Sequence, residues 1–155
     1  MAQMTISKDQ QTIKQWAYLL GYLGAIPFLS LAVTLSLVDA QSRVLVAPAL
    51  HLYGAIILSF LGGLHWGRIA CKQDYKTSDK WFLIYSVVPS LIGWLSFLLS
   101  YIWHDASSIL IAGFIMSYVI DIRFSKTCQW QSWMKPLRTN LTLIACFSLT
   151  LLWFV

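Results

Sequence analysis

Long apolar runs alternate with short polar segments along this chain. Five runs stand out, at residues 16–38, 45–69, 81–103, 106–124 and 137–155. A helix needs about 20 mostly apolar residues to cross the hydrocarbon core of a bilayer. Because backbone polar groups in lipid must be satisfied within their own segment, each run is predicted to be helical. The pattern therefore predicts an all-α integral membrane bundle of five transmembrane helices, forming a single domain over residues 1–155.

The connections between the runs refine this picture. Only His104 and Asp105 separate the third run from the fourth, so these two helices are expected to be antiparallel neighbours. Asp105 or Ser107 is expected to cap the fourth helix, because short polar side chains accept hydrogen bonds from helix N-termini. The runs leave no length for a separate soluble domain. The first partner of the chain is therefore the lipid bilayer.

Composition and charge agree with a membrane location and set an orientation. Charged residues make up 11% of the chain, against about 25% in a soluble domain. The basic residues lie in loops and form no basic helical face, which argues against nucleic acid. Arg43 alone lies on one side, and ten basic residues lie on the other: Lys8, Lys14, Arg68, Lys72, Lys76, Lys80, Arg123, Lys126, Lys135 and Arg138. The positive-inside rule then places the N-terminus inside and the C-terminus outside, in a bacterial inner membrane or, in a eukaryote, a mitochondrial membrane.

The second run contains an unusual concentration of glycine, in the stretch YGAIILSFLGGLHWG from Tyr53 to Gly67. Glycine weakens a helix by roughly 1 kcal/mol relative to alanine. On a helix, one face would carry His51, Gly54, Ala55, Ser59, Gly62 and His65, while the opposite face would carry Ile56, Ile57, Phe60 and Leu64. Ala55, Ser59, Gly63 and Gly67 also step by four, and such small-residue ridges let membrane helices approach closely. We expect the ridge to contact another helix, with Gly21, Gly24 and Pro27 of the first run as a plausible partner.

Two interpretations of this face remain open. It packs against a neighbouring helix, or it lines a site for a lipid, a quinone or a haem with His51, Gly62 and His65 as its polar part. His51 and His65 are about 21 Å apart along a helix, so they cannot bind one metal ion together. His104 could join His51 as a second haem ligand. The sequence specifies no cofactor and predicts no metal site.

Asp121 is the only acidic residue inside an apolar run. Ionisable residues within membrane spans are rare and usually paired. Arg138, at the start of the fifth run, is the expected partner, and Arg68 is the second candidate. The sequence predicts an ion pair near the inner ends of the helices.

Motifs of common enzymes are absent from the sequence. The chain has no glutamate, no GxSxG, no HExxH and no phosphate-binding loop. We predict no catalytic residues. The favoured function is non-enzymatic: an interaction or assembly component that presents helix faces to other membrane proteins or to a second copy of itself.

Four segments together resemble a known group of proteins: YGAIILSFLGGLHWG, SVVPSLIGW at 86–94, SYVIDIRF around Asp121, and WMKPLRTNLTL at 133–143. They resemble the uncharacterised bacterial and mitochondrial membrane proteins grouped with transmembrane protein sixty-nine. The resemblance implies a small multi-spanning membrane protein and brings no activity. It marks, by position, Tyr53, Gly54, Ser59, Gly62, Gly63, Trp66, Gly67, Asp121, Trp133, Leu137, Arg138 and Thr142.

Overall fold

The computed structural model describes residues 8–77, 79–124 and 131–154, and in these residues all regular structure is helical. Side chains are described throughout these ranges except at His104 and Phe124. The elements are α1 (Lys8–Leu37), α2 (Ala40–Ala70), α3 (Asp79–Leu99), η1 (His104–Ala106), α4 (Ser107–Phe124), α5 (Met134–Thr150) and η2 (Leu151–Phe154). The predicted all-α class is therefore confirmed for the described residues. The first two helices begin well before the apolar runs that predicted them.

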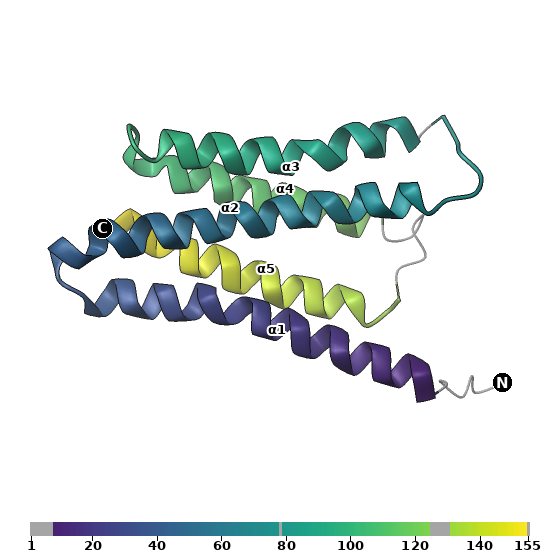
Figure 1. The fold of residues 1–155 in the computed structure, drawn as a ribbon, viewed down its shortest axis with the longest axis horizontal. Coiled ribbons are helices and arrows are strands. Elements are labelled where there is room, and N and C mark those ends of the chain that lie inside the picture. Colours follow the sequence, from purple (N-terminus) through teal and green to yellow (C-terminus); the bar gives the residue numbers. More distant parts are fainter. Residues whose placement is uncertain (1–7, 78, 125–130, 155) are drawn as a thin grey trace.

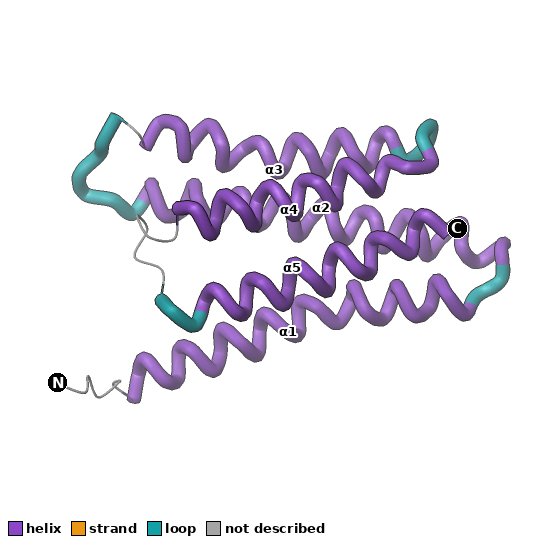
Figure 2. Tube along the Cα trace, turned by 180° about the vertical axis from the view of Figure 1, so that it is seen from behind, coloured by secondary structure: helices purple, strands orange, loops and turns teal. Residues whose placement is uncertain are grey.

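The helices run alternately up and down, so that consecutive helices are antiparallel (Figure 1). Figures 1 and 2 both show α3 at one edge of the bundle and α1 at the other. α2 contacts each of the other four long helices, and its contact with α3 is the most extensive. The start of α1 and the end of η2 lie at opposite ends of the bundle. We call the end that holds the start of α1 the basic end, because the loops and helix ends there carry Lys14, Arg68, Lys72 and Arg123.

The turn between α1 and α2 lies at the opposite end and is fixed by a helix cap. The Asp39 side chain precedes α2 and accepts a hydrogen bond from the Ser42 backbone N–H at 3.4 Å. An aspartate at this position satisfies one of the free N–H groups of the first helical turn. Hydrogen bonding from Ser42, first from its side chain and then from its backbone N–H, holds the pKa of the Asp39 carboxyl below its usual value of 3.8. The cap explains why the chain reverses within two residues, Val38 and Asp39.

The outward surface of the bundle is strongly apolar. Phe60 and Trp94 are each 61% exposed, and Phe147 is 68% exposed. Four helical segments are long and apolar enough to cross a membrane: Lys8–Leu37, Ala40–Ala70, Asp79–Leu99 and Met134–Phe154. The remaining helix, α4, has 18 residues, or about 27 Å of helix. The exposed apolar surface and the four long helices support a multi-pass membrane protein.

Glycines bring α2 and α3 into close contact. A Cβ atom on Gly62 would collide with the Ser86 carbonyl oxygen, and one on Gly93 would lie 2.9 Å from the Ala55 carbonyl oxygen. The helix that closes on this face of α2 is therefore α3, and the expectation of α1 as the partner was wrong. At Gly63 and Gly67 the predicted ridge makes no contact within the chain, because no atom lies within 4 Å of a Cβ placed at either position. The contact line passes through Gly62 because helical geometry puts Gly63 about 100° further around α2.

Candidate functional site

A buried polar cluster joins three helices toward the basic end of the bundle. Asp121 on α4 receives two side chains: Nε2 of His65 on α2 lies 2.8 Å from Oδ1, and Nε of Arg138 on α5 lies 2.7 Å from Oδ2. His65, Asp121 and Arg138 are 6%, 5% and 9% exposed. Because a carboxylate only accepts, both nitrogens donate. Asp121 is thus held from two sides by separate helices.

The Arg138 guanidinium makes two further hydrogen bonds. One nitrogen donates to Thr142 Oγ1 and the other to Ser117 Oγ, each at 3.1 Å. We call these five residues, His65, Ser117, Asp121, Arg138 and Thr142, the Asp121 cluster. A buried ion pair is tolerated when the charges are paired and their remaining hydrogen-bonding groups are satisfied. The cluster meets this condition for Arg138.

Aromatic rings complete the surroundings of His65. The Tyr85 ring meets it edge-on at 5.3 Å and the Phe82 ring stacks at 6.4 Å, both from α3. Arg68, the second partner considered for Asp121, lies one turn further along α2. It lines a small cavity of about 230 Å³ beside His65 and Lys72. The Asp121 cluster therefore links α2, α4 and α5 directly and is bordered by α3.

A second polar arrangement lies toward the other end of α2. His51 Nε2 is 2.8 Å from Ser96 Oγ, and Ser96 Oγ donates to the Ala106 carbonyl at 2.8 Å. A hydroxyl has one hydrogen, so Ser96 must accept from His51, and the hydrogen-bond network assigns the proton to Nε2. In the neutral ring, Nδ1 is then an acceptor. This relay connects α2, α3 and the turn that leads into α4.

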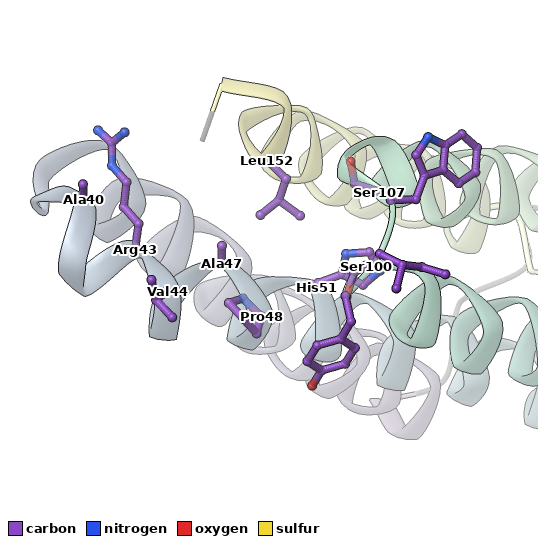
Figure 3. Close-up of a pocket in the computed structure, with 12 residues that line it drawn as sticks. Ala40, Arg43, Val44, Ala47, Pro48, His51, Ser100, Ser107 and Leu152 are labelled. Atoms are coloured by element: carbon purple, nitrogen blue, oxygen red, sulfur yellow. The ribbon is translucent and has the colours of Figure 1, made fainter.

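A cavity of about 540 Å³ opens beside His51, between α2, the α3–α4 turn and η2 (Figure 3). We call it the His51 cavity. His51, Ser100 and Ser107 supply polar side chains, Arg43 supplies a charge, and the apolar lining includes Val44, Pro48 and Leu152. Ser107 Oγ is buried and has no hydrogen-bond partner in the described part of the chain. The expectation that Ser107 caps α4 was therefore wrong, and its hydroxyl is available inside the protein.

The residues singled out from the sequence do not form one site. His51 and His65 lie in different halves of α2, each with its own partner. Between them, the side chains of Leu110 and Leu149 fill the space beside Gly54. Ser59 Oγ forms a 2.8 Å hydrogen bond with Ser90 Oγ of α3. Gly63, Gly67 and Trp66 lie outside this buried strip, and Trp66 is 57% exposed. The possible role of His104 as a haem ligand falls on a side chain outside those that the structure describes.

Several residues in these arrangements were not identified from the sequence: Ser96, Ser117 and Tyr85. The buried face of α3 passes through Ser86, Pro89, Gly93 and Ser96. These positions are separated by three or four residues, which is the spacing of one helical face. Small and polar residues at this spacing in an apolar run are the signal that could have identified this face. Ser117 had no comparable signal, because its role depends on where Arg138 lies.

The pattern marked in α5 falls on its buried side. Leu137 packs beside Gly21 of α1, where a Cβ would lie 3.2 Å from Leu137 Cδ1. Arg138 donates a hydrogen bond to Asp121, and Thr142 accepts one from Arg138. The Trp133 carbonyl accepts a 3.0 Å hydrogen bond from the Tyr18 hydroxyl. These contacts attach α5 to α1 and α4.

Comparison with known proteins identifies a family and relatives, of which two are described below. Residues 13–154 match the family described as Protein of unknown function (DUF3429). Transmembrane protein 69 of Xenopus tropicalis is 37% identical over 134 residues, covering 86% of this chain and 51% of the relative. Transmembrane protein 69 of Mus musculus is 29% identical over 125 residues, covering 81% and 50%. The chain thus spans about half the length of these relatives. No solved structure matches.

Proposed function

The chain belongs to the DUF3429 family, which matches nearly its whole length, and from this premise we propose that it is a non-enzymatic interaction or assembly component of a membrane. Four helical segments support a multi-pass protein. The proposal adds α4 as a fifth membrane span. It places the basic end inside, following the positive-inside rule. The membrane is a bacterial inner membrane or, in a eukaryote, a mitochondrial membrane.

The observation that carries the proposal is the contrast between two sets of glycines in the helices. Atoms of a neighbouring helix occupy the space that a side chain would need at Gly54, Gly62, Gly93 and Gly113. Contacts within the chain therefore explain why these positions are glycine. Gly63 and Gly67 on α2, like Gly24 on α1, have no atom within 4 Å of a Cβ, but only Gly63 and Gly67 are spaced as a GxxxG pair. Each weakens α2 by roughly 1 kcal/mol relative to alanine. No contact among the described residues compensates for this weakening.

A helix from another chain would explain these two glycines. Gly63 and Gly67 form a GxxxG pair, which lets two membrane helices approach closely and gain dispersion contacts. Phe60 and Leu64 flank them and are 61% and 53% exposed. We call Phe60, Gly63, Leu64 and Gly67 the Gly63 face. Its proposed occupant is a transmembrane helix of a second protein or of a second copy of this chain.

The buried clusters support the presentation of this face. His65 points toward Asp121 in the interior, and Gly63, two residues earlier, lies about 200° around the helix from it. The His65 contact therefore fixes the rotation of α2 that turns the Gly63 face outward. A rigidly presented face is suited to binding because little conformational entropy is lost on association.

Substitution of Gly63 by leucine tests the proposal. Gly63→Leu adds bulk where the partner helix would approach, and its Cβ would have no atom of the chain within 4 Å. We expect the purified variant to fold normally and to lose its higher-order complex on native gels and in cross-linking of intact membranes. The matched control is Gly24→Leu on α1, where a Cβ also has no neighbour within 4 Å.

Two results would contradict the proposal. In the first, Gly63→Leu and Gly67→Leu retain the same complexes as the original chain. In the second, the original chain itself runs as a monomer and cross-links to no protein in native membranes. A loss of complexes in Gly24→Leu as well would show that the effect is not specific to the Gly63 face.

Ligand binding was the second function considered, on a face formed by His51, Gly62 and His65. Gly62 is covered by Ser86 and Pro89 of α3, so the three residues do not line a common cavity. His51 alone of the three lines the His51 cavity. A ligand-binding function is therefore proposed only for that cavity.

A further inference from the structure

The His51 cavity contains an unused hydroxyl group at depth. Ser107 is 2% exposed, and its Oγ has no hydrogen-bond partner among the described residues. A buried hydroxyl without a partner destabilises a fold, because no hydrogen bond replaces those it made to water. Ser107 lines the cavity, and its Oγ, which has almost no accessible surface in this conformation, would reach a bound molecule by rotation of the side chain. The hydroxyl therefore marks the cavity as a site built for a polar atom.

His51 adds a second polar group with a defined role. Its Nε2 donates to Ser96, so the neutral ring offers only Nδ1, as an acceptor, to a ligand. Ser107 can donate through its hydrogen and accept through its oxygen. A hydroxyl group on the ligand satisfies both residues, because it donates to Nδ1 and accepts from Ser107. A carbonyl oxygen satisfies only Ser107.

The remaining lining determines the rest of the ligand. Val44, Pro48 and Leu152 give the cavity apolar walls, and Figure 3 shows Val44 and Leu152 on different elements. Val44 is 71% exposed, so this side opens to the surroundings of the bundle. The volume of about 540 Å³ lies within the usual range of about 300–1,000 Å³ for small-molecule sites. A ring with a short apolar chain fits this space.

We propose that the His51 cavity binds a membrane-soluble molecule with a hydroxyl-bearing aromatic head, of the hydroquinone class, with the head between Ser107 and His51 and the tail along Val44 toward the lipid. This site is distinct from the Gly63 face, and neither proposal depends on the other. The ligand enters from the bilayer, where such molecules are concentrated. The site binds the ligand and carries out no reaction on it.

Three probes of nearly equal size test the proposal: a decyl-substituted hydroquinone, its oxidised quinone and its dimethyl ether. Binding is measured anaerobically with the full chain in phosphatidylcholine nanodiscs, and empty nanodiscs provide the partitioning background. We expect the hydroquinone to bind at least about fivefold more tightly than the other two, because only it can donate to His51. Equal affinities for the three probes would overturn the proposal.

Matched variants separate binding from folding. Ser107→Ala removes the unused hydroxyl, so we expect normal folding and about fivefold weaker hydroquinone binding. Ser148→Ala is the control, because Ser148 Oγ is also buried without a partner but lies outside the His51 cavity. Val44→Trp narrows the mouth of the cavity and should weaken binding, whereas Leu45→Trp, at a residue 78% exposed and outside the lining, should not.

Two other results would also overturn the proposal. One is binding that Ser107→Ala and Val44→Trp leave unchanged, which would indicate partitioning into the bilayer. The other is tight binding of phosphatidylglycerol that depends on Arg43 and not on Ser107, which would identify the cavity as a site for an anionic lipid head group. If Ser107→Ala fails to fold, the paired variants at Val44 and Leu45 decide the outcome.

Discussion

His65 on α2 and Asp121 on α4 are 56 positions apart in the sequence, and their side chains meet at 2.8 Å in the interior of the bundle. Arg138 binds the other carboxylate oxygen of the same aspartate. The carboxylate is therefore the common acceptor of two donors from different helices. Asp121 therefore links α2, α4 and α5 through its two carboxylate oxygens.

Asp121→Asn should destabilise the protein strongly. The amide removes the negative charge and leaves the Arg138 guanidinium buried without a counter-ion, a change that typically costs about 3–5 kcal/mol. Arg138→Gln should cost a similar amount, because it removes the charge that pairs with the buried aspartate while the His65 contact remains. Unfolding of purified protein in mixed micelles by a denaturing detergent measures both values.

A double substitution checks that the two residues act together. Asp121→Asn combined with Arg138→Gln should be less destabilising than the sum of the single changes, because the pair is removed as a unit. Additive losses would contradict the pairing. Lys135→Gln serves as a control, because Lys135 is an exposed basic residue on the same helix.

Alanine substitutions at the neighbouring Gly62 and Gly63 of α2 should change the stability of the fold in opposite directions. A Cβ on Gly62 would collide with the Ser86 carbonyl, so Gly62→Ala should destabilise the fold by about 1–3 kcal/mol. Gly63→Ala meets open space and should stabilise the isolated chain by up to about 1 kcal/mol through helix propensity. Thermal unfolding in detergent distinguishes the two. Equal effects would mean that α2 is rotated differently from the arrangement described here.

Alanine substitutions at two buried serines, Ser96 and Ser148, should also differ in their effect on stability. Ser96 accepts from His51 and donates to the Ala106 carbonyl, so Ser96→Ala leaves both groups without their partner and should cost about 1–3 kcal/mol. Ser148 is fully buried without a partner, so Ser148→Ala should be neutral or stabilising. The same unfolding assay applies. A large loss from Ser148→Ala would show that its hydroxyl has a partner in solution.

The Asp39 cap at the α1–α2 turn should make the stability of the fold depend on pH in the acidic range. Hydrogen bonding from the side chain and the backbone of Ser42 lowers the pKa of Asp39 from its usual value of 3.8. A lowered pKa means that the ionised form stabilises the fold above the unfolded value and that this contribution is lost as the pH falls through the folded value. The melting temperature of the original chain relative to Asp39→Asn should therefore fall below about pH 4.

Asparagine is the appropriate comparison for this measurement. It also caps helices but does not titrate. If the difference between the two proteins stayed constant from about pH 6 to about pH 3, the Asp39 carboxylate would not contribute to stability through this hydrogen bond. Asp74, which is exposed in the α2–α3 loop, provides a control through Asp74→Asn.

The sequence alone determined the class of the protein and the approximate helices. Runs of about 20 apolar residues leave few structures available in lipid, and all five runs correspond to helices in the structure. The sequence also indicated that Asp121 needs a partner and proposed Arg138. These inferences succeeded because each depends on local hydrophobicity or on the cost of an unpaired charge, which hold in any packing arrangement.

Only the tertiary structure decided which residues meet. The difference between Gly62 and Gly63 is one step of about 100° around the same helix, and the sequence contains both glycines without indicating which faces α3. The His65–Asp121 contact, the relay from His51 to Ala106 and the unpartnered Ser107 likewise depend on the relative rotation of helices distant in sequence. Periodicity describes the faces of each helix separately, whereas the choice of facing partners is made by packing the whole bundle.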